Sequence, residues 1–255
     1  LTKNKKRFDK KKALYDAGIK AAVCFKEGEI TPVMIRETET EERIIERGIN
    51  TIISDHTSPS EQPQVSLEIV GIPKILCMIL NNEHQYAADE RSLRYTEVKP
   101  NEYISDLEVE LYDKWLNIFI KILNHEYLDF FKKFNKGDTE EKTNKKAASA
   151  IKKIAQENAR YMVSVFMPTT LTYTVPFAQI NKLCLYMQRI IESPQNDFEK
   201  LLIPYLKEFI QGLKDIDVLL TEKDVYDLCP KLARNESEDL LYKNNKEIDL
   251  SLFAE

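Results

Sequence analysis

Hydrophobic residues recur at helical spacing over several long segments of the chain. Between Leu107 and Phe134 they form one broad stripe, which predicts a long amphipathic helix. This stripe consists of Leu111, Trp115, Ile118, Phe119, Ile122 and Leu123. The same periodicity predicts helices over residues 13–25, 39–53, 147–161, 179–191 and 198–213, and a shorter apolar helix over 73–80. We expect the following side chains to be buried: Ile44, Ile49, Ile69, Leu76, Trp115, Phe119, Ile122 and Leu183.

Two segments have the character of strands. Val65, Leu67 and Ile69 alternate with polar residues, as in a half-buried strand, and residues 168–175 are rich in threonine and tyrosine. Residues 135–146 are charged and contain Gly137, which predicts a loop. Together the elements predict an α+β fold, a single domain with a mixed or antiparallel sheet flanked by long helices.

The chain divides into three parts by composition. Residues 1–12 are rich in lysine and are interpreted as a basic, flexible lead. Residues 13–213 carry the periodic elements and form the predicted domain. Residues 214–255 are acidic and less periodic, and they are interpreted as a C-terminal extension.

Composition narrows the classes of function. The 255 residues are 43% hydrophobic and 31% charged, which is typical of a globular protein with a sizeable core. The net charge of −5 argues against a nucleic-acid partner, because neutralising phosphates needs a basic field. The apolar run over 72–80 is interrupted by Pro73 and Lys74 and is too short to cross a bilayer, so no membrane association is expected.

The cysteines and histidines do not predict a metal site. Cys24, Cys77, Cys184 and Cys229 are far apart, and no two of the three histidines share metal-ligand spacing. Three of the cysteines stand among apolar residues, which predicts buried free thiols in a reducing, cytoplasmic environment.

The most chemically dense stretch is Asp89-Glu90-Arg91-Ser92-Leu93-Arg94-Tyr95. An extended chain places Glu90, Ser92 and Arg94 on one face, whereas a helix places Arg91 with Arg94 and Tyr95, and the sequence leaves both open. In either case the guanidinium of Arg94 and the hydroxyl of Ser92 can bind an anion. The alternative is a solvated, charge-rich loop.

Arg160 and His56 can each be interpreted either as a functional residue or as an ordinary surface residue. Arg160 lies between a predicted helix and the threonine-rich segment, where it either points into a cleft or is an ordinary surface arginine. His56 lies in a turn between a helix and a strand, a place where functional side chains are common, although a loop histidine can also be incidental.

The order of these features resembles the flavin-dependent thymidylate synthases. Ala21-Ala22-Val23-Cys24-Phe25 resembles an early A-A-R-V-S-F/Y element of that family, and Asp55 to Glu61 resembles its G-H-x-[ST]-P-x-E-H turn. The signature R-H-R-x-x-S-x-N-E-x-S-x-R-Y falls on residues 82–95. Glu157-Asn158-Ala159-Arg160 resembles the E-x-A-R motif, and Tyr173-Thr174-Val175 resembles W-T-V/M.

The resemblance implies two groups of site residues. The group that would bind the nucleotide dUMP consists of Glu90, Ser92, Arg94, Tyr95, Arg160 and Arg189. The group that would bind the flavin or folate consists of His56, Ser58, Glu61, Asn82, Glu83 and His84. No residue is assigned as catalytic, because in this family the cofactors carry the chemistry and the protein orients them.

The chain departs from the family motifs mainly on the flavin side. Asn82-Glu83-His84 replaces R-H-R, and Ala87 replaces the signature serine. The N-x-R-S-L element after W-T-V has no direct counterpart, so Gln179 or Asn181 would have to substitute for its asparagine. Arg189 matches the later pyrimidine-binding arginine only after a shift of register.

The resemblance implies FAD-dependent reductive methylation of dUMP to dTMP, with methylenetetrahydrofolate and NADPH as further cofactors. It also implies a cytoplasmic homotetramer. Because the R-H-R triplet is lost, the alternative is a catalytically silent relative that binds a nucleotide or serves as an assembly subunit. A third interpretation is methylation of a related pyrimidine nucleotide such as UMP.

Overall fold

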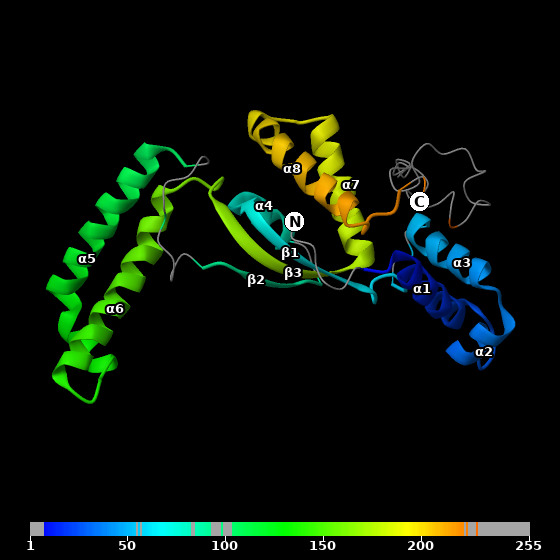
Figure 1. The fold of residues 1–255 in the computed structure, drawn as a ribbon, viewed down its shortest axis with the longest axis horizontal. Helices are drawn as coiled ribbons and strands as arrows, with labels where there is room; N and C mark the ends of the chain where they lie inside the picture. The colour runs from blue at the N-terminus through cyan, green and yellow to red at the C-terminus, as the bar shows by residue number, and fades with distance from the viewer. Residues whose placement is uncertain are drawn as a thin grey trace, which may run out of the picture. The chain divides into compact units, whose positions relative to one another are not determined.

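The computed structural model of the chain describes residues 8–54, 56, 58–82, 85–92, 98, 104–221, 223 and 228 (Figure 1). The fold is α+β, as predicted, and its strands form a three-stranded antiparallel sheet in the order β1-β3-β2. Strand β1 is Gln64–Pro73, β2 is Ala87–Glu90 and β3 is Pro168–Pro176. The helices are α1 Lys10–Phe25, α2 Pro32–Thr38, α3 Glu41–Ile53, α4 Lys74–Leu80, α5 Asp106–Phe134, α6 Glu140–Ala159, the 3-10 helix η1 Arg160–Met162, α7 Phe177–Glu192 and α8 Asp197–Asp215.

The chain forms two compact units, and the boundary between them crosses all three strands. The first unit contains residues 1–68, 80–88 and 172–255, and the second contains residues 69–79 and 89–171. The predicted division into 1–12, 13–213 and 214–255 stays a prediction, although α1 already begins at Lys10, inside the predicted lead.

In the first unit, α1 and α3 cross at two glycines. A Cβ added to Gly18 would lie 1.8 Å from the backbone oxygen of Ile44, and one added to Gly48 would lie 2.0 Å from that of Leu14. Only glycine allows two helix backbones to approach so closely. Leu14 and Ile44 are fully buried at this contact, so the crossing seals part of the core.

A buried carboxylate joins the three N-terminal helices. The side chain of Glu39, only 3% exposed, accepts hydrogen bonds from Lys26 and Arg47, and Arg47 also donates to the backbone oxygen of Gly18 at 3.1 Å. Burial alone would raise the pKa of Glu39, but the hydrogen bonds and charges of Lys26 and Arg47 outweigh it, so the pKa is lowered.

The segment that follows α8 is part of the core of the first unit. Val218, Leu219 and Leu220 are buried. The buried ammonium of Lys10 donates to Asp217 Oδ1 at 2.7 Å and to the backbone oxygen of Leu219 at 2.8 Å. These contacts attach the start of the acidic extension to α1.

In the second unit, α5 and α6 form a helical hairpin whose helices lie side by side (Figure 1). Tyr112, Ala159 and Met167 are buried in its core. Ser105 and Glu108 form a capping box at the start of α5, and Glu108 also accepts the backbone N–H of Ser164 at 2.7 Å. The long predicted helix over 107–134 is therefore confirmed.

Several expectations about local structure were wrong. The charged residues 140–146 continue α6 instead of forming a loop, because Thr139 caps the helix and glutamate and lysine are good helix formers in solvent. Helix α2 was not predicted, because its seven residues are too few to show a period. Cys77 and Cys184 are buried as predicted, whereas Cys24 is exposed.

The predicted core was correct in five of its eight positions, the exceptions lying on α5. Trp115 is 37% exposed and Ile122 is 47% exposed, while Phe119 is half-buried. The apolar stripe of α5 is wider than the surface that the second unit covers, so its outer edge remains accessible. Within the described residues, no helix is both long and apolar enough to span a bilayer.

Candidate active site

The predicted site residues fall in both units. The second unit holds Glu90, Ser92 and Arg160, all of which were assigned to the nucleotide. The first unit holds Arg189 and, from the flavin group, His56, Ser58, Glu61 and Asn82. Arg94, Tyr95, Glu83 and His84 lie outside the described residues. The candidate residues for the nucleotide and for the flavin thus lie mainly in different units.

Glu90 is the last residue of β2, and its carboxylate is held by Lys74. The Lys74 ammonium donates to Glu90 Oε2 at 2.5 Å, and the Glu90 side chain is 15% exposed. The backbone N–H of Lys74 donates to the oxygen of Met167 at 2.8 Å, which fixes the start of α4 next to the segment that leads into β3. Glu90 Oε1 has no further hydrogen bond within the part of the chain that is described. The second carboxylate oxygen of Glu90 and the ammonium of Lys74 therefore lie close together.

The sequence allowed residues 89–95 to form either a strand or a helix, and the structure shows a strand as far as Glu90. Strand β2 ends at Glu90, and the backbone N–H of Arg91 continues the pairing by donating to the oxygen of Thr170 at 2.9 Å. Alternation along an extended backbone directs Glu90 and Ser92 to the same side. Ser92 is half-buried. A carboxylate and a hydroxyl therefore lie on the same side at the end of this strand.

Cys77 lies near the same ion pair but is chemically inert. Burial, reinforced by the negative charge of Glu90, raises the pKa of the Cys77 thiol to about 12. A thiol with so high a pKa carries almost no thiolate at neutral pH, and the thiolate is the nucleophile. Cys77 is therefore not suited to act as a nucleophile beside the Lys74–Glu90 pair.

Arg160 occupies the junction between α6 and η1, where its guanidinium is partly accessible. Its side chain is 33% exposed, and its NH2 group lies 3.9 Å from Glu157 Oε1. The guanidinium also lies over the ring of Tyr161, 5.5 Å from the ring centroid. These contacts are long and solvent-accessible, so they leave most donors of the fork free to bind an anion.

In the first unit, His56 is exposed and its ring pairs with Phe25. The two ring centroids are 4.9 Å apart, and Phe25 is 59% exposed. The following loop is anchored to α7, because Ala178 N–H donates to the Ser60 oxygen and Phe177 N–H donates to the Pro63 oxygen. This anchored loop holds Ser58, which is exposed, and Glu61, which is half-buried.

Asn82 is exposed just after α4, beside a pair of tyrosines. Tyr86 stacks on Tyr173 with centroids 5.6 Å apart and donates to the backbone oxygen of Asn81 at 2.7 Å. Tyr173 donates to the backbone oxygen of Leu80 at 2.9 Å. The end of α4 is therefore fixed by aromatic side chains, and Asn82 contributes an amide where the resembled family has a cation.

Helix α7 carries the two remaining candidates. Arg189 is exposed in its last turn. Asn181 is buried: its Nδ2 donates to the Phe177 oxygen at 2.9 Å, and its Oδ1 accepts the backbone N–H of Leu220 at 3.1 Å. Asn181 thus holds the segment after α8. Because its amide nitrogen and its amide oxygen are both engaged within the core, Asn181 is not placed to substitute for the family asparagine.

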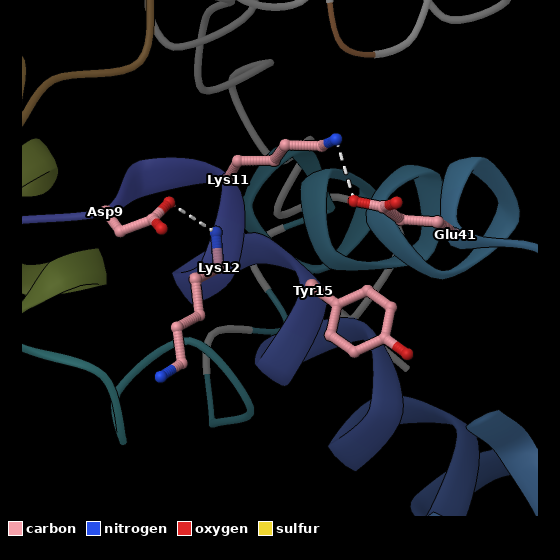
Figure 2. Close-up of a pocket in the computed structure, with 5 residues that line it drawn as sticks. All are labelled: Asp9, Lys11, Lys12, Tyr15 and Glu41. Atoms are coloured by element: carbon pink, nitrogen blue, oxygen red, sulfur yellow. Dashed lines mark hydrogen bonds and ion pairs between the residues drawn. The ribbon is translucent and has the colours of Figure 1, made fainter.

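One surface pocket of the first unit is lined by none of the predicted site residues. It has a volume of about 350 Å³ in the first unit and is lined by Asp9, Lys11, Lys12, Tyr15 and Glu41 (Figure 2). Lys11 forms an ion pair with Glu41 at 2.7 Å, and Asp9 caps α1 by accepting the backbone N–H of Lys12. Two of its charged side chains, Lys11 and Glu41, therefore pair with each other. Within the described ranges, no group of three or more His, Cys, Asp or Glu residues is arranged to hold a metal ion.

Sequence reasoning did not select Lys74 or Phe25 as site residues. The signal for Lys74 was a single lysine inside an apolar run, and that for Phe25 was an aromatic residue at the end of a helix. Neither signal identifies the partner, because Lys74 and Glu90 are 16 residues apart and Phe25 and His56 are farther still. Their roles follow from packing alone.

Comparison with known proteins identifies the family. Two crystal structures of the flavin-dependent thymidylate synthase ThyX from Helicobacter pylori, both with FAD and dUMP, are similar to this chain. One is 17% identical and covers 86% of this chain and 94% of its own, with a TM-score of 0.42. The other is 16% identical and covers 91% and 95%, with a TM-score of 0.43. No curated protein matches significantly. The profile of the family described as thymidylate synthase complementing protein, Thy1, matches residues 11–211, so the chain belongs to this family.

Proposed function

We propose that this protein is an FAD-dependent thymidylate synthase that converts dUMP to dTMP by reductive methylation. Membership of the Thy1 family over residues 11–211 carries the proposal. Methylenetetrahydrofolate is the proposed carbon donor, and NADPH is the proposed source of electrons. The ThyX structures that resemble the chain contain FAD and dUMP, which agrees with this choice of cofactor and substrate.

The nucleotide would be bound by the second unit and by Arg94. A phosphate dianion is best bound by forked cations together with a hydroxyl. Arg160 has an accessible guanidinium and Ser92 supplies the hydroxyl, while Arg94 and Tyr95 belong to the proposed set by resemblance. Glu90, held by Lys74, would accept a hydrogen bond from the uracil ring through its second oxygen.

The described residues of the first unit fit the ring system of a flavin. The exposed rings of Phe25 and His56 offer an aromatic surface, and Ser58 and Glu61 offer polar groups in the loop that follows His56. When bound, the reduced flavin supplies the hydride. The residues of this chain would hold and orient the ring and exclude water. Asn82 is neutral, so losing a cation there would weaken FAD binding by about one or two factors of ten.

The proposal also includes the oligomeric state and the location of the protein. The proposed enzyme is a cytoplasmic homotetramer with active sites between subunits. Arg189 would then be the pyrimidine-binding arginine, and its exposure at the end of α7 leaves it accessible to a ligand.

The proposal is tested by spectroscopy and by turnover. Purified protein should show the absorption of bound flavin in the blue, or should acquire it on addition of FAD. With FAD, NADPH and methylenetetrahydrofolate present, it should release tritium from dUMP labelled at C5. Protein that stays colourless at saturating FAD and releases no tritium would refute the enzymatic function.

A second function is favoured by one observation. The flavin-side triplet begins with Asn82 in place of arginine, so the positive charge expected there is absent at that position. A catalytically silent relative would retain nucleotide binding through Ser92 and Arg160 and would lose FAD. Calorimetric titration with dUMP and with FAD in separate experiments distinguishes the two functions. Binding of both supports the enzyme, whereas binding of dUMP alone supports the silent relative.

A further inference from the structure

Lys74 is the first residue of α4, and backbone hydrogen bonds fix its position. Its own N–H donates to the Met167 oxygen at 2.8 Å, and the N–H of Ile75 donates to the Val165 oxygen at 2.8 Å. Both acceptors lie in the short segment that connects η1, which begins at Arg160, to β3. The start of α4 is therefore attached at two points to the segment that follows Arg160.

The ion-pair partner of Lys74 is fixed by the sheet. Glu90 ends β2, and the backbone N–H of the next residue, Arg91, donates to the Thr170 oxygen of β3 at 2.9 Å. The Lys74 ammonium donates to Glu90 Oε2 at 2.5 Å. The Glu90 side chain is 15% exposed and that of Lys74 is 39% exposed, so the ammonium is the more accessible group. Because both side chains are already held, they can meet a ligand with little further loss of freedom.

The pair has hydrogen-bonding capacity of both kinds left over. An ammonium carries several donors, and a carboxylate carries acceptors on both of its oxygens. Among the residues that the structure describes, the side chains of Lys74 and Glu90 bond only to each other. Further donors of Lys74 and the Oε1 acceptor of Glu90 are therefore presented next to each other.

A uracil ring carries the complementary groups on adjacent positions. Its N3–H is a donor, and its O4 carbonyl oxygen is an acceptor. We infer that Lys74 is a specificity-determining residue, which donates to O4 of the substrate base while Glu90 accepts the N3–H. The inference rests on the proposed function, since dUMP supplies the base and its bound phosphate fixes which edge of the ring meets the pair.

The proposed phosphate contacts arise from the same elements as the pair. Ser92 follows Glu90 on the same side of the extended chain. Arg160 precedes the segment to which Lys74 is attached. All of these residues belong to the second unit, so the packing of that unit alone can set the distance between the phosphate contacts and the base contacts.

The pairing with Glu90 favours a base over a phosphate as the ligand group of Lys74. A phosphate dianion next to the ammonium would also lie next to the Glu90 carboxylate, and like charges so close repel each other strongly. A carbonyl oxygen is neutral, so it can accept from Lys74 without this repulsion. Lys74 is therefore expected to contact the base, whereas Arg160 and Ser92 contact the phosphate.

The same pair excludes cytosine in the register that uracil adopts. Cytosine has an acceptor at position 3 and an amino group at position 4, so its order of donor and acceptor is reversed. The Glu90 carboxylate would face a lone pair, and the Lys74 ammonium would face N–H groups. A site that leaves its polar groups unpaired in this way discriminates strongly against the wrong ligand.

Calorimetric titration of the full-length chain with dUMP and with dCMP tests the inference. Lys74→Met should weaken dUMP binding by about ten- to a hundredfold and should leave dCMP binding unchanged or stronger, so the preference for dUMP falls. Lys145→Met is the matched control, because Lys145 pairs with Glu141 at 2.7 Å on α6 of the same unit and is 75% exposed. This control should keep the wild-type affinity for both nucleotides. Lys74→Arg, which retains a cation beside Glu90, should restore part of the preference.

A double variant covers the case in which Lys74→Met leaves the Glu90 charge unpaired and fails to fold, as judged by circular dichroism. Lys74→Met combined with Glu90→Gln removes both charges and should bind dUMP and dCMP with similar affinity. The inference is overturned if a folded Lys74→Met protein, single or double, keeps the wild-type preference, or if Lys74→Met weakens dUMP and dCMP by the same factor, as loss of a phosphate contact would. A wild type that binds dUMP and dCMP equally overturns the inference alone, whereas a wild type that binds neither nucleotide overturns the proposed function as well.

Discussion

Replacing Gly48 by alanine tests the close crossing of α1 and α3 in the first unit. A Cβ at this position would lie 2.0 Å from the Leu14 oxygen, whereas real Cβ atoms essentially never come within 3.0 Å of another heavy atom. Both sides of the contact are helix backbone, so no side chain can rotate away. The two helices must therefore separate by about 1 Å to accept the methyl group.

The cost of that separation follows from what lies at the crossing. Leu14 and Ile44 are fully buried there, and burial of each contributes about 1.5–3 kcal/mol. A gap of this size forfeits about a quarter to a half of the dispersion attraction, which amounts to about 1–2 kcal/mol for the pair. Strain from overpacking adds about 1–3 kcal/mol, and the better helix propensity of alanine returns about 1 kcal/mol. We expect a net loss of about 2 kcal/mol in the free energy of unfolding.

The assay is urea unfolding followed by circular dichroism, with hydrogen exchange of the α1 and α3 peptides to assign the effect to this unit. Asn50→Ala is the matched control, because Asn50 is exposed on the same helix and the change also improves helix propensity. It should leave the unfolding midpoint unchanged or raise it slightly. Gly48→Ala should lower the midpoint and speed exchange in α1 and α3.

The double variant Gly18→Ala, Gly48→Ala sharpens the test. Gly18 meets the Ile44 oxygen at the same crossing, so once the helices have separated for one methyl group the second should cost less. The two losses should therefore not add. A Gly48→Ala protein as stable as Asn50→Ala would refute the close crossing, and strictly additive losses would refute a shared displacement.

Three further predictions concern charge and reactivity. Arg160→Ala should weaken dUMP binding by about 1.5–3 kcal/mol, and Arg160→Lys should restore only part because an ammonium lacks the fork; calorimetry showing unchanged affinity in both would remove Arg160 from the site. Because the pKa of Glu39 is lowered in the folded state, its stabilisation is present above the unfolded carboxyl pKa and is lost as pH falls through the folded pKa. Urea midpoints measured between neutral pH and pH 3 should thus fall more for the wild type than for Glu39→Gln, and parallel curves would contradict this. Exposed Cys24 should react with a thiol reagent at neutral pH, while Cys77 and Cys184, whose burial raises each pKa to about 12, should react only after unfolding in urea; equal rates in the native protein would refute their burial.

Local pattern determined most of the secondary structure. Helical periodicity and composition located every described α-helix except the short α2, and the period of two residues located β1. Strand β3 was predicted from its threonine and tyrosine content, whereas the sequence left β2 open. The start of α6 was misplaced because residues 140–146 are polar or charged and so show no hydrophobic period. Helix propensity and the cap at Thr139 stabilise this part of the helix instead. The ordered motifs also identified the family, since motif order along a chain is a property of sequence alone.

The tertiary structure decided which groups meet. Lys74 neutralises Glu90, and Phe25 lies against His56, because helices and strands separated in sequence pack side by side. Asn181 was a candidate from its position after β3, but packing assigns it to the backbone of Leu220. The sequence contains no distances between such residues, so it could name the candidates but not their partners.

The width of the apolar stripe on α5 separates the two kinds of information most clearly. The sequence shows that Trp115, Phe119 and Ile122 share one hydrophobic band and therefore avoid water. It does not show whether the band meets one surface or two. In the structure, Phe119 packs on the core of the second unit while Trp115 and Ile122 remain exposed, because a single facing helix covers only part of so broad a band.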